Sequence, residues 1–148
     1  MAWIVGMRSH VRGQPPTAPF FLVANHQSYV DIVLLLVHLD TVFVAKRELA
    51  AWPAVGYLTR LVGTIFLDRR RHRDAHRVLE KIERRIGEGD GIVVFPEGTS
   101  SEGDGVYPMK AALFEWAATT EQPVHLVTIH YATRPGQRSA RESVCWWG

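Results

Sequence analysis

The chain has 148 residues, of which 47% are hydrophobic and 22% charged, a composition typical of one folded domain and not of a disordered or fibrous chain. The net charge of +2 gives no reason to expect nucleic acid as a partner, and a single cysteine, Cys145, excludes an internal disulfide or a site with several cysteine ligands. No apolar run approaches the ~20 residues of a membrane-spanning helix, and Met1–Met7 is too short for a signal-peptide core, so we expect a soluble or peripheral intracellular protein.

The predicted elements alternate between strands and helices. Gly13 and three prolines predict a loosely structured lead-in over 1–19, before a folded domain over 20–148. Five short apolar runs predict strands at Phe20–Ala24, Thr41–Ala45, Thr64–Asp68, Gly91–Phe95 and Val124–Tyr131. Helical patterns occupy Asp31–His38, Pro53–Leu61, Asp74–Ile86 and Pro108–Thr119. This order predicts an α/β fold with a central, largely parallel sheet flanked by helices, in which ligands bind at the loops after the strands.

The first polar cluster, Asn-His-Gln-Ser-Tyr-Val-Asp over 25–31, follows the first predicted strand. On one continuous helix His26 and Asp31 would lie about 140° apart and could not cooperate. Ser28, three residues before the acid, predicts a helix start of the capping-box type, which lets the carboxylate fold back towards the imidazole. An Asp that accepts one ring N–H leaves the other nitrogen as a base. The alternative is that Asp31 only favours the helix dipole and that His26 closes a loop.

Two further clusters adjoin predicted strands. In Phe-Pro-Glu-Gly-Thr over 95–99, proline ends the strand and Gly98 permits a tight turn, so Glu97 and Thr99 are expected on the same rim as His26. An ordinary turn is the alternative. In the segment 46–69, Arg69 ends the stretch Ile-Phe-Leu-Asp-Arg, where a guanidinium group can hold a phosphate or a carboxylate.

Together these stretches resemble the lysophospholipid acyltransferase family, the relatives of 1-acylglycerol-3-phosphate acyltransferase. The family's four blocks are recognisable in order: N-H-x-x-x-x-D at 25–31, K-x-E-L to D-R at 46–69, F-P-E-G-T at 95–99, and an apolar strand at 124–130. The resemblance implies a glycerolipid acyltransferase fold and transfer of a fatty acyl group from acyl-CoA or acyl-carrier protein to the hydroxyl of a lysolipid. It implies no bound cofactor or metal, and a peripheral location on the cytoplasmic face of the membrane.

The resemblance also implies roles for individual residues. His26 would be the general base that deprotonates the acceptor hydroxyl, Asp31 would orient it, and backbone N–H groups near Ser28 are candidates to bind the oxyanion. Acceptor binding is implied for residues of the second and third blocks, namely Arg69, Glu97, Gly98 and Thr99, with Lys46 and Ser100 as further candidates.

The sequence departs from the family in two places. The family usually has Arg after F-P-E-G-T, where this chain has Ser100 followed by Ser-Glu-Gly-Asp. The missing Arg weakens the case for an acceptor with a phosphate group. The sequence after Thr99 is similar to that of bacterial lyso-ornithine lipid acyltransferases, so lysophosphatidic acid and lyso-ornithine lipid both stay open as acceptors. Family members also continue past the fourth block, so we expect the domain to be incomplete at its carboxyl end. The alternatives are a non-catalytic lipid-binding module and a hydrolase or transacylase with Ser28 as nucleophile.

Other polar groups have simpler interpretations. The segment Arg69–Arg85 carries eight Lys and Arg against three acids, which suits either docking on anionic lipid, coenzyme A or an acidic carrier protein, or a solvated helix face. His125 and His130 are five apart in a predicted strand and would point to opposite faces, so they form no metal-ligand pair. Cys145 is predicted to be an ordinary buried cysteine.

Overall fold

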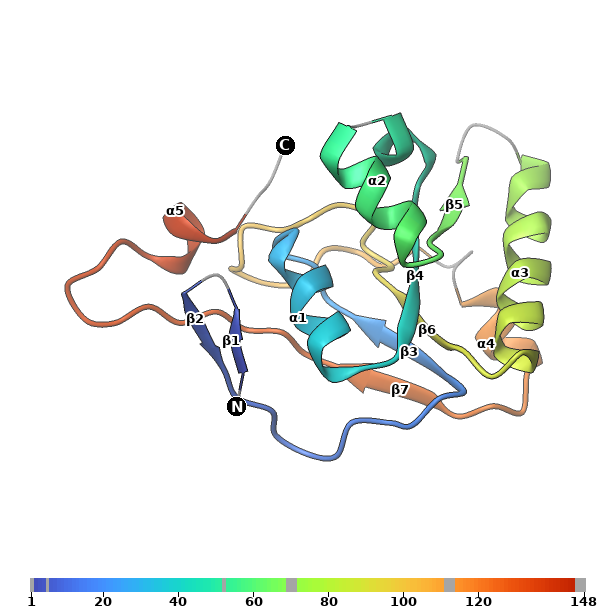
Figure 1. Ribbon diagram of the computed structural model, residues 1–148, viewed down its shortest axis with the longest axis horizontal. Helices are drawn as coiled ribbons and strands as arrows, with labels where there is room; N and C mark the ends of the chain where they lie inside the picture. Colours follow the sequence, from blue (N-terminus) through green and yellow to red (C-terminus); the bar gives the residue numbers. More distant parts are fainter. Residues whose placement is uncertain (1, 5, 52, 69–71, 111–113, 146–148) are drawn as a thin grey trace.

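The fold is built on a five-stranded parallel sheet with the strand order β5-β4-β6-β3-β7 (Figure 1). The computed structural model describes residues 2–4, 6–51, 53–68, 72–110 and 114–145. The strands are β3 (Phe20–Ala24), β4 (Thr41–Lys46), β5 (Ile65–Leu67), β6 (Gly91–Val94) and β7 (Val124–Val127). The predicted α/β class with a parallel central sheet is confirmed.

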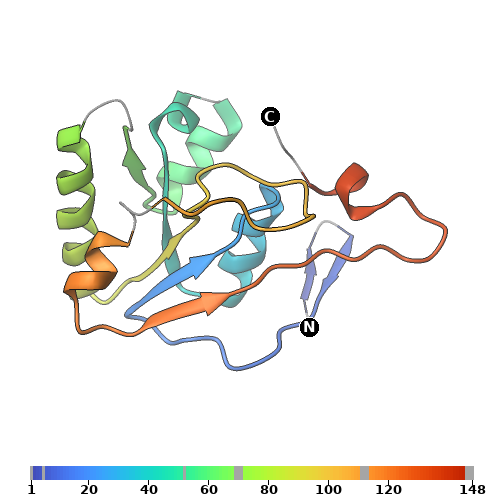
Figure 2. The ribbon, with the colours of Figure 1, turned by 180° about the vertical axis from the view of Figure 1, so that it is seen from behind.

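Helices cover both faces of this sheet (Figures 1 and 2). Helix α1 (Val30–His38) packs on one face, while α3 (His72–Gly87) and α4 (Glu115–Thr119) pack on the other. A 3-10 helix, η1 (Arg47–Ala51), leads into α2 (Pro53–Leu61), and a short α5 (Ala140–Ser143) lies near the carboxyl end. None of the helices in the described part of the chain is long and apolar enough to cross a membrane.

Strand β3 shows why the central strands are apolar throughout. Phe20 and Leu22 pack in the cluster beneath α1, whereas Phe21 and Val23 pack in the cluster beneath α3. All five residues of the strand are buried. Because successive side chains of a strand point to opposite faces, a strand covered on both sides needs apolar residues at every position.

Strand β7 is shorter than predicted. It ends at Val127, four residues before the predicted end at Tyr131. Beyond it, the side chain of Asn25 accepts the Ile129 backbone N–H at 2.7 Å and donates to the Ile129 carbonyl at 2.9 Å. These two bonds take the place of strand pairing, so His130 lies outside the strand and the prediction that it shares one strand with His125 is wrong.

Two other predictions also fail locally. The helix expected over Pro108–Thr119 is present only as α4, and residues 111–113 lie outside the described part of the chain. The Lys110 backbone N–H donates to the Pro96 carbonyl at 2.9 Å, which holds that part of the segment against the 96–101 loop. Within the expected lead-in, β1 (Ala2–Ile4) and β2 (Met7–Ser9) pair as an antiparallel hairpin.

Candidate active site

The turn between β3 and α1 brings His26 and Asp31 into contact. His26 Nδ1 lies 2.8 Å from Asp31 Oδ2. The carboxylate side chain is fully buried, while the imidazole is 15% exposed. One nitrogen of the imidazole ring therefore contacts a carboxylate that is shielded from solvent, while part of the ring's surface remains accessible to a ligand. The contact that the predicted helix start at Ser28 allows is present.

The start of α1 forms half of the predicted capping box. Asp31 Oδ2 accepts the backbone N–H of Gln27 at 2.7 Å and that of Ser28 at 2.9 Å. The Ser28 hydroxyl accepts the N–H of Val30 at 3.3 Å, where a full box would use the N–H of Asp31. The helix accordingly begins at Val30. The side chain of Asp31 thus folds its own turn as well as holding His26.

The loop after β6 fixes His26 from the other side. The His26 backbone N–H donates to Glu97 Oε1 at 2.7 Å, and the His26 carbonyl accepts the Ser101 N–H at 2.8 Å. The ring of Phe95 stacks on the imidazole with 4.2 Å between centroids and 23° between planes. The expectation that the 25–31 and 95–99 segments share one rim is therefore confirmed by direct contacts.

Both carboxylate oxygens of Glu97 accept hydrogen bonds from the protein backbone. Its side chain is buried, and its second oxygen, Oε2, accepts the Tyr107 backbone N–H at 2.6 Å. Gly98 forms the turn with φ of 70°, and its N–H donates to the Phe95 carbonyl at 3.0 Å. Thr99 and Ser100 follow on the same loop, both half-buried. The carboxylate of Glu97 links two segments of this loop to the turn that holds His26.

The remaining predicted residues lie further from the His26–Asp31 pair or cannot be placed. Lys46 ends β4 and is half-buried. Because β6 separates β4 from β3, the two strands are roughly 10 Å apart. Arg69 lies outside the described residues.

Tyr131 is the residue that sequence reasoning missed. Its hydroxyl donates to Asp31 Oδ1 at 2.5 Å, on the side of the carboxylate away from His26. Burial and the neighbouring Asp31 charge raise the pKa of the Tyr131 hydroxyl, so it remains a donor. The signal in the sequence was a polar-tipped aromatic residue at the end of the last predicted strand, on the rim where parallel strands place functional groups.

Backbone N–H groups near Ser28 are expected to bind the oxyanion, and this expectation is wrong for three of these groups. The N–H groups of Gln27 and Ser28 donate to Asp31, and that of Val30 donates to the Ser28 hydroxyl. Because each of these donors has a partner within the turn, none of the three is free to bind an oxyanion.

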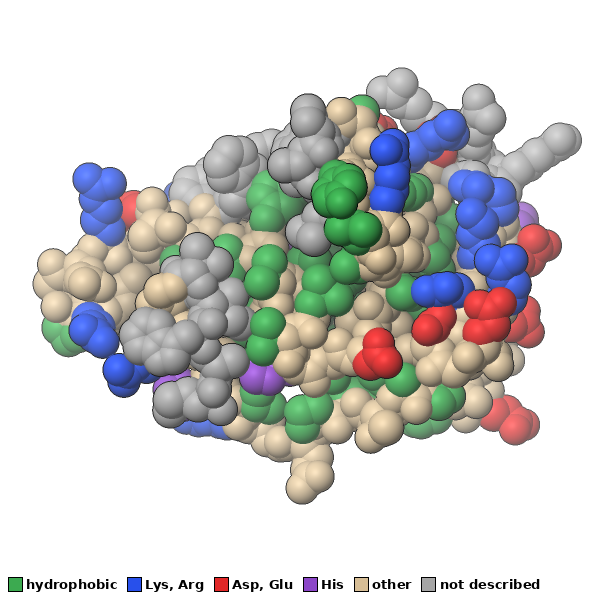
Figure 3. Space-filling model, viewed as in Figure 1, with side chains coloured by type: hydrophobic (Ala, Val, Ile, Leu, Met, Phe, Trp, Pro, Cys, Tyr) green, Lys and Arg blue, Asp and Glu red, His purple; other side chains and the backbone are tan. Residues whose placement is uncertain are grey.

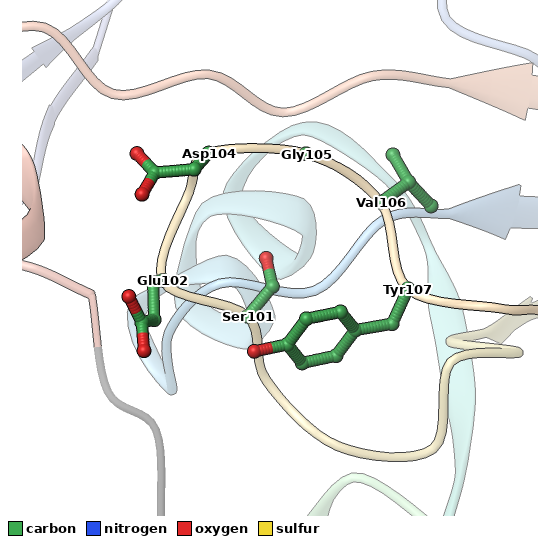
Figure 4. A pocket seen from close by; sticks show the side chains of 6 residues that line it. All are labelled: Ser101, Glu102, Asp104, Gly105, Val106 and Tyr107. Atoms are coloured by element: carbon green, nitrogen blue, oxygen red, sulfur yellow. The ribbon is translucent and has the colours of Figure 1, made fainter.

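Two cavities lie beside this rim. One, of about 300 Å³, is an open hollow lined by the 101–107 loop, with the side chains of Ser101 and Tyr107 directed towards the interior of the loop (Figure 4). The other, of about 200 Å³, is lined by Gln27, Tyr131 and Cys145 among others. Glu102 lines both. Within the described residues, no three His, Cys, Asp or Glu side chains group in a way that could hold a metal ion.

Comparisons with known proteins decide the family. A family model described as Acyltransferase matches residues 8–132. The chain belongs to this acyltransferase family. A lyso-ornithine lipid O-acyltransferase of Rhizobium meliloti (strain 1021) is 38% identical over 117 residues, which are 78% of this chain and 40% of the relative. A 1-acyl-sn-glycerol-3-phosphate acyltransferase of Neisseria gonorrhoeae is 34% identical over 122 residues, which are 82% of this chain and 48% of the relative.

A solved structure of the same family shares the fold. The crystal structure of the 1-acyl-sn-glycerophosphate acyltransferase PlsC from Thermotoga maritima matches with a TM-score of 0.57 and 36% sequence identity. The match covers 74% of this chain and 44% of that chain. The chain therefore spans about two fifths to a half of the length of these acyltransferase relatives.

Proposed function

We propose that this acyltransferase moves a fatty acyl group from a thioester donor, acyl-CoA or acyl-carrier protein, to the hydroxyl of a lysolipid. The observation that carries the proposal is the contact between His26 and Asp31 at the carboxyl end of β3. Its support from the comparisons is that relatives are named for lyso-ornithine lipid and for 1-acyl-sn-glycerol-3-phosphate. The proposal needs no bound cofactor.

The proton follows a short path in this proposal. An ionised carboxylate only accepts hydrogen bonds, so the Nδ1–H group of His26 donates a hydrogen bond to Asp31. The unprotonated Nε2 is then left as the base. Nε2 takes the proton of the acceptor hydroxyl while the oxygen attacks the thioester carbonyl carbon. When the C–S bond breaks, the imidazolium returns the proton to the leaving thiolate. General-base catalysis of this kind is worth roughly 10²–10⁴ in rate.

A second candidate concerns the acceptor. Ser100 stands where the family usually has Arg, and Glu102 lines both cavities beside the site. Glu102 is already paired with the guanidinium group of Arg141, which also lines the smaller cavity. The missing Arg at position 100 therefore carries this candidate, because without that guanidinium group a phosphate loses a partner, and an acceptor such as lyso-ornithine lipid is favoured over lysophosphatidic acid. Thr99, Ser100 and Lys46 remain candidates for head-group contact, and Arg69 remains a candidate for phosphate contact.

The location at the membrane surface follows from the lipid acceptor. The basic segment is a weaker support, because Arg84 and Arg85 at the end of α3 pair with the nearby acids Glu88 and Asp90, at 3.7 Å and 2.7 Å. Figure 3 shows basic and acidic side chains intermixed on that side of the molecule. This pattern is typical of a solvated helix face. We propose a peripheral location at the cytoplasmic face, reached through the lipid substrate.

The test is an assay with labelled acyl-CoA and acyl-carrier protein against lysophosphatidic acid and lyso-ornithine lipid. His26→Ala should lower the rate by roughly 10²–10⁴, while the matched variant His76→Ala, at an exposed position on α3, should leave it unchanged. Full activity of His26→Ala would overturn the assignment of the base. Lysolipid binding without turnover from either donor would favour a non-catalytic binding module.

Mass spectrometry of the quenched reaction separates the remaining alternative. A hydrolase or transacylase with Ser28 as nucleophile would accumulate an acyl-enzyme. The Ser28 side chain is buried and its hydroxyl accepts the N–H of Val30, which suits a helix cap. We therefore expect no acyl adduct, and an adduct on Ser28 would replace the direct-transfer proposal.

A further inference from the structure

The Asp31 carboxylate is held from two sides, and only one of them belongs to its own turn. Oδ2 accepts from the His26 ring and from the backbone N–H groups of Gln27 and Ser28. Oδ1 accepts from the hydroxyl of Tyr131, which is 100 residues further along the chain. Within the residues that the structure describes, four donors thus converge on one buried carboxylate, and a single side chain supplies the donor for the second oxygen.

The backbone two residues before Tyr131 is held by side chains other than that of Asp31. Two residues earlier, the backbone of Ile129 is held by both polar atoms of the Asn25 side chain, at 2.7 and 2.9 Å. The Gln27 side chain donates to the same Ile129 carbonyl at 3.1 Å. Ile129 itself is buried in the cluster beneath α1. The chain therefore reaches Tyr131 from a docked segment, and the hydroxyl arrives at Asp31 from a supported position.

We propose that Tyr131 is a positioning residue for acyl transfer, whose hydroxyl sets the plane of the Asp31 carboxylate so that Oδ2 faces His26 Nδ1. The proposal rests on the proposed function, because it matters only if His26 is the base. The terminal torsion of an aspartate is broad and has no strong staggered minimum, so the carboxylate plane is set by its hydrogen-bond partners. A buried oxygen that loses its donor is costly, and the carboxylate would turn to recover one.

The chemistry of Tyr131 suits this role. Burial and the adjacent negative charge of Asp31 raise the pKa of the hydroxyl, so the phenol keeps its proton at the pH values where a histidine base operates. The hydroxyl therefore donates throughout that range and does not compete with His26 as a base. Because Tyr131 also lines the smaller cavity, a ligand seated there would lie against the same ring.

The experiment compares Tyr131→Phe with Tyr57→Phe, a control that removes a phenol hydroxyl from an exposed position on α2. We expect Tyr131→Phe to lower kcat about tenfold while KM for both substrates stays within about twofold of the wild type, because phenylalanine keeps the ring that lines the smaller cavity and lacks only the hydroxyl that donates to Asp31. Tyr57→Phe should match the wild type. Equal kcat in Tyr131→Phe and the wild type, with His26→Ala inactive, would overturn the positioning role alone. Full activity of His26→Ala would overturn the assignment of the base on which this proposal rests, and absence of acyl transfer by the wild type would overturn the proposed function itself.

A readout that needs no turnover completes the test. Proton NMR should show the His26 Nδ1 proton as a downfield signal in the wild type, and this signal should broaden or disappear in Tyr131→Phe. If that variant does not fold, 3-fluorotyrosine at position 131 retains the packing and makes the hydroxyl a stronger donor. The His26 signal should then shift, and an unchanged signal would overturn the proposal.

Discussion

The replacement Glu97→Gln tests whether this carboxylate is a structural link or an acceptor-binding group. Glu97 is 3% exposed and accepts the backbone N–H groups of His26 and Tyr107 at 2.7 and 2.6 Å. A glutamine keeps one acceptor oxygen and presents an NH₂ group to the other N–H. One hydrogen bond is then lost, and two buried donors face each other.

The size of the effect follows from these contacts. A hydrogen bond to a charged group contributes about 1.5–3 kcal/mol, and an unsatisfied buried donor costs about 1–3 kcal/mol. Because the side chain can relax in part, we expect Glu97→Gln to lower the free energy of unfolding by about 2–4 kcal/mol. For a domain of this size that corresponds to a fall in Tm of ~6–12 °C.

The assay is urea unfolding followed by circular dichroism, with Glu80→Gln as the control. Glu80 is exposed on α3, and its replacement should change the free energy of unfolding by less than about 0.5 kcal/mol. If Glu97 acted mainly on the acceptor, Glu97→Gln would raise KM while its stability matched that of the control. That result would refute the structural reasoning.

Three further predictions concern packing, thiol reactivity and pH. Gly91→Ala should lower the free energy of unfolding by about 1–3 kcal/mol, because its new Cβ would lie 2.3 Å from the Phe20 ring. The control Gly87→Ala places its Cβ in open space and should be neutral or stabilising, so equal effects of the two replacements in urea unfolding would contradict this. Burial, with the charges of Asp31 and Asp104, raises the pKa of the Cys145 thiol, so iodoacetamide should alkylate this thiol more slowly at pH 8 than it alkylates free cysteine. An equal rate would be evidence against the raised pKa. Because the pKa of Tyr131 is raised in the folded state, the unfolded chain loses this proton first as the pH rises, so the stability that this group contributes should be constant below about pH 10 and fall above it. If the difference in free energy of unfolding between the wild type and Tyr131→Phe does not change up to pH 11, this linkage is excluded.

The elements that the sequence predicts well are those set by local pattern. Phe20–Ala24 is a strand over the predicted residues, because five successive apolar side chains suit a strand buried on both faces. Strand β7 was predicted too long, because its end depends on the side chain of Asn25, which lies 104 positions before Ile129. No pattern within one segment carries that information.

The same distinction applies to the candidate site. The contact between His26 and Asp31 could be predicted because both residues and the helix start lie within one short turn. The donor from Tyr131 could not, because its approach depends on how the chain docks after β7. Glu97 was expected on the correct rim, but its two hydrogen bonds to backbone groups depend on the path of a loop that returns ten residues later at Tyr107.

The central claim, that Asp31 holds His26 in the form that leaves Nε2 as a base, can be measured on the protein without substrate. Nitrogen-15 NMR of labelled imidazole groups, with His26 assigned by its absence in His26→Ala, distinguishes a ring protonated at Nδ1 from one protonated at Nε2. We predict that the neutral ring of His26 carries its proton on Nδ1. A neutral ring protonated at Nε2 would contradict it, since the nitrogen that must take the acceptor's proton would already hold one.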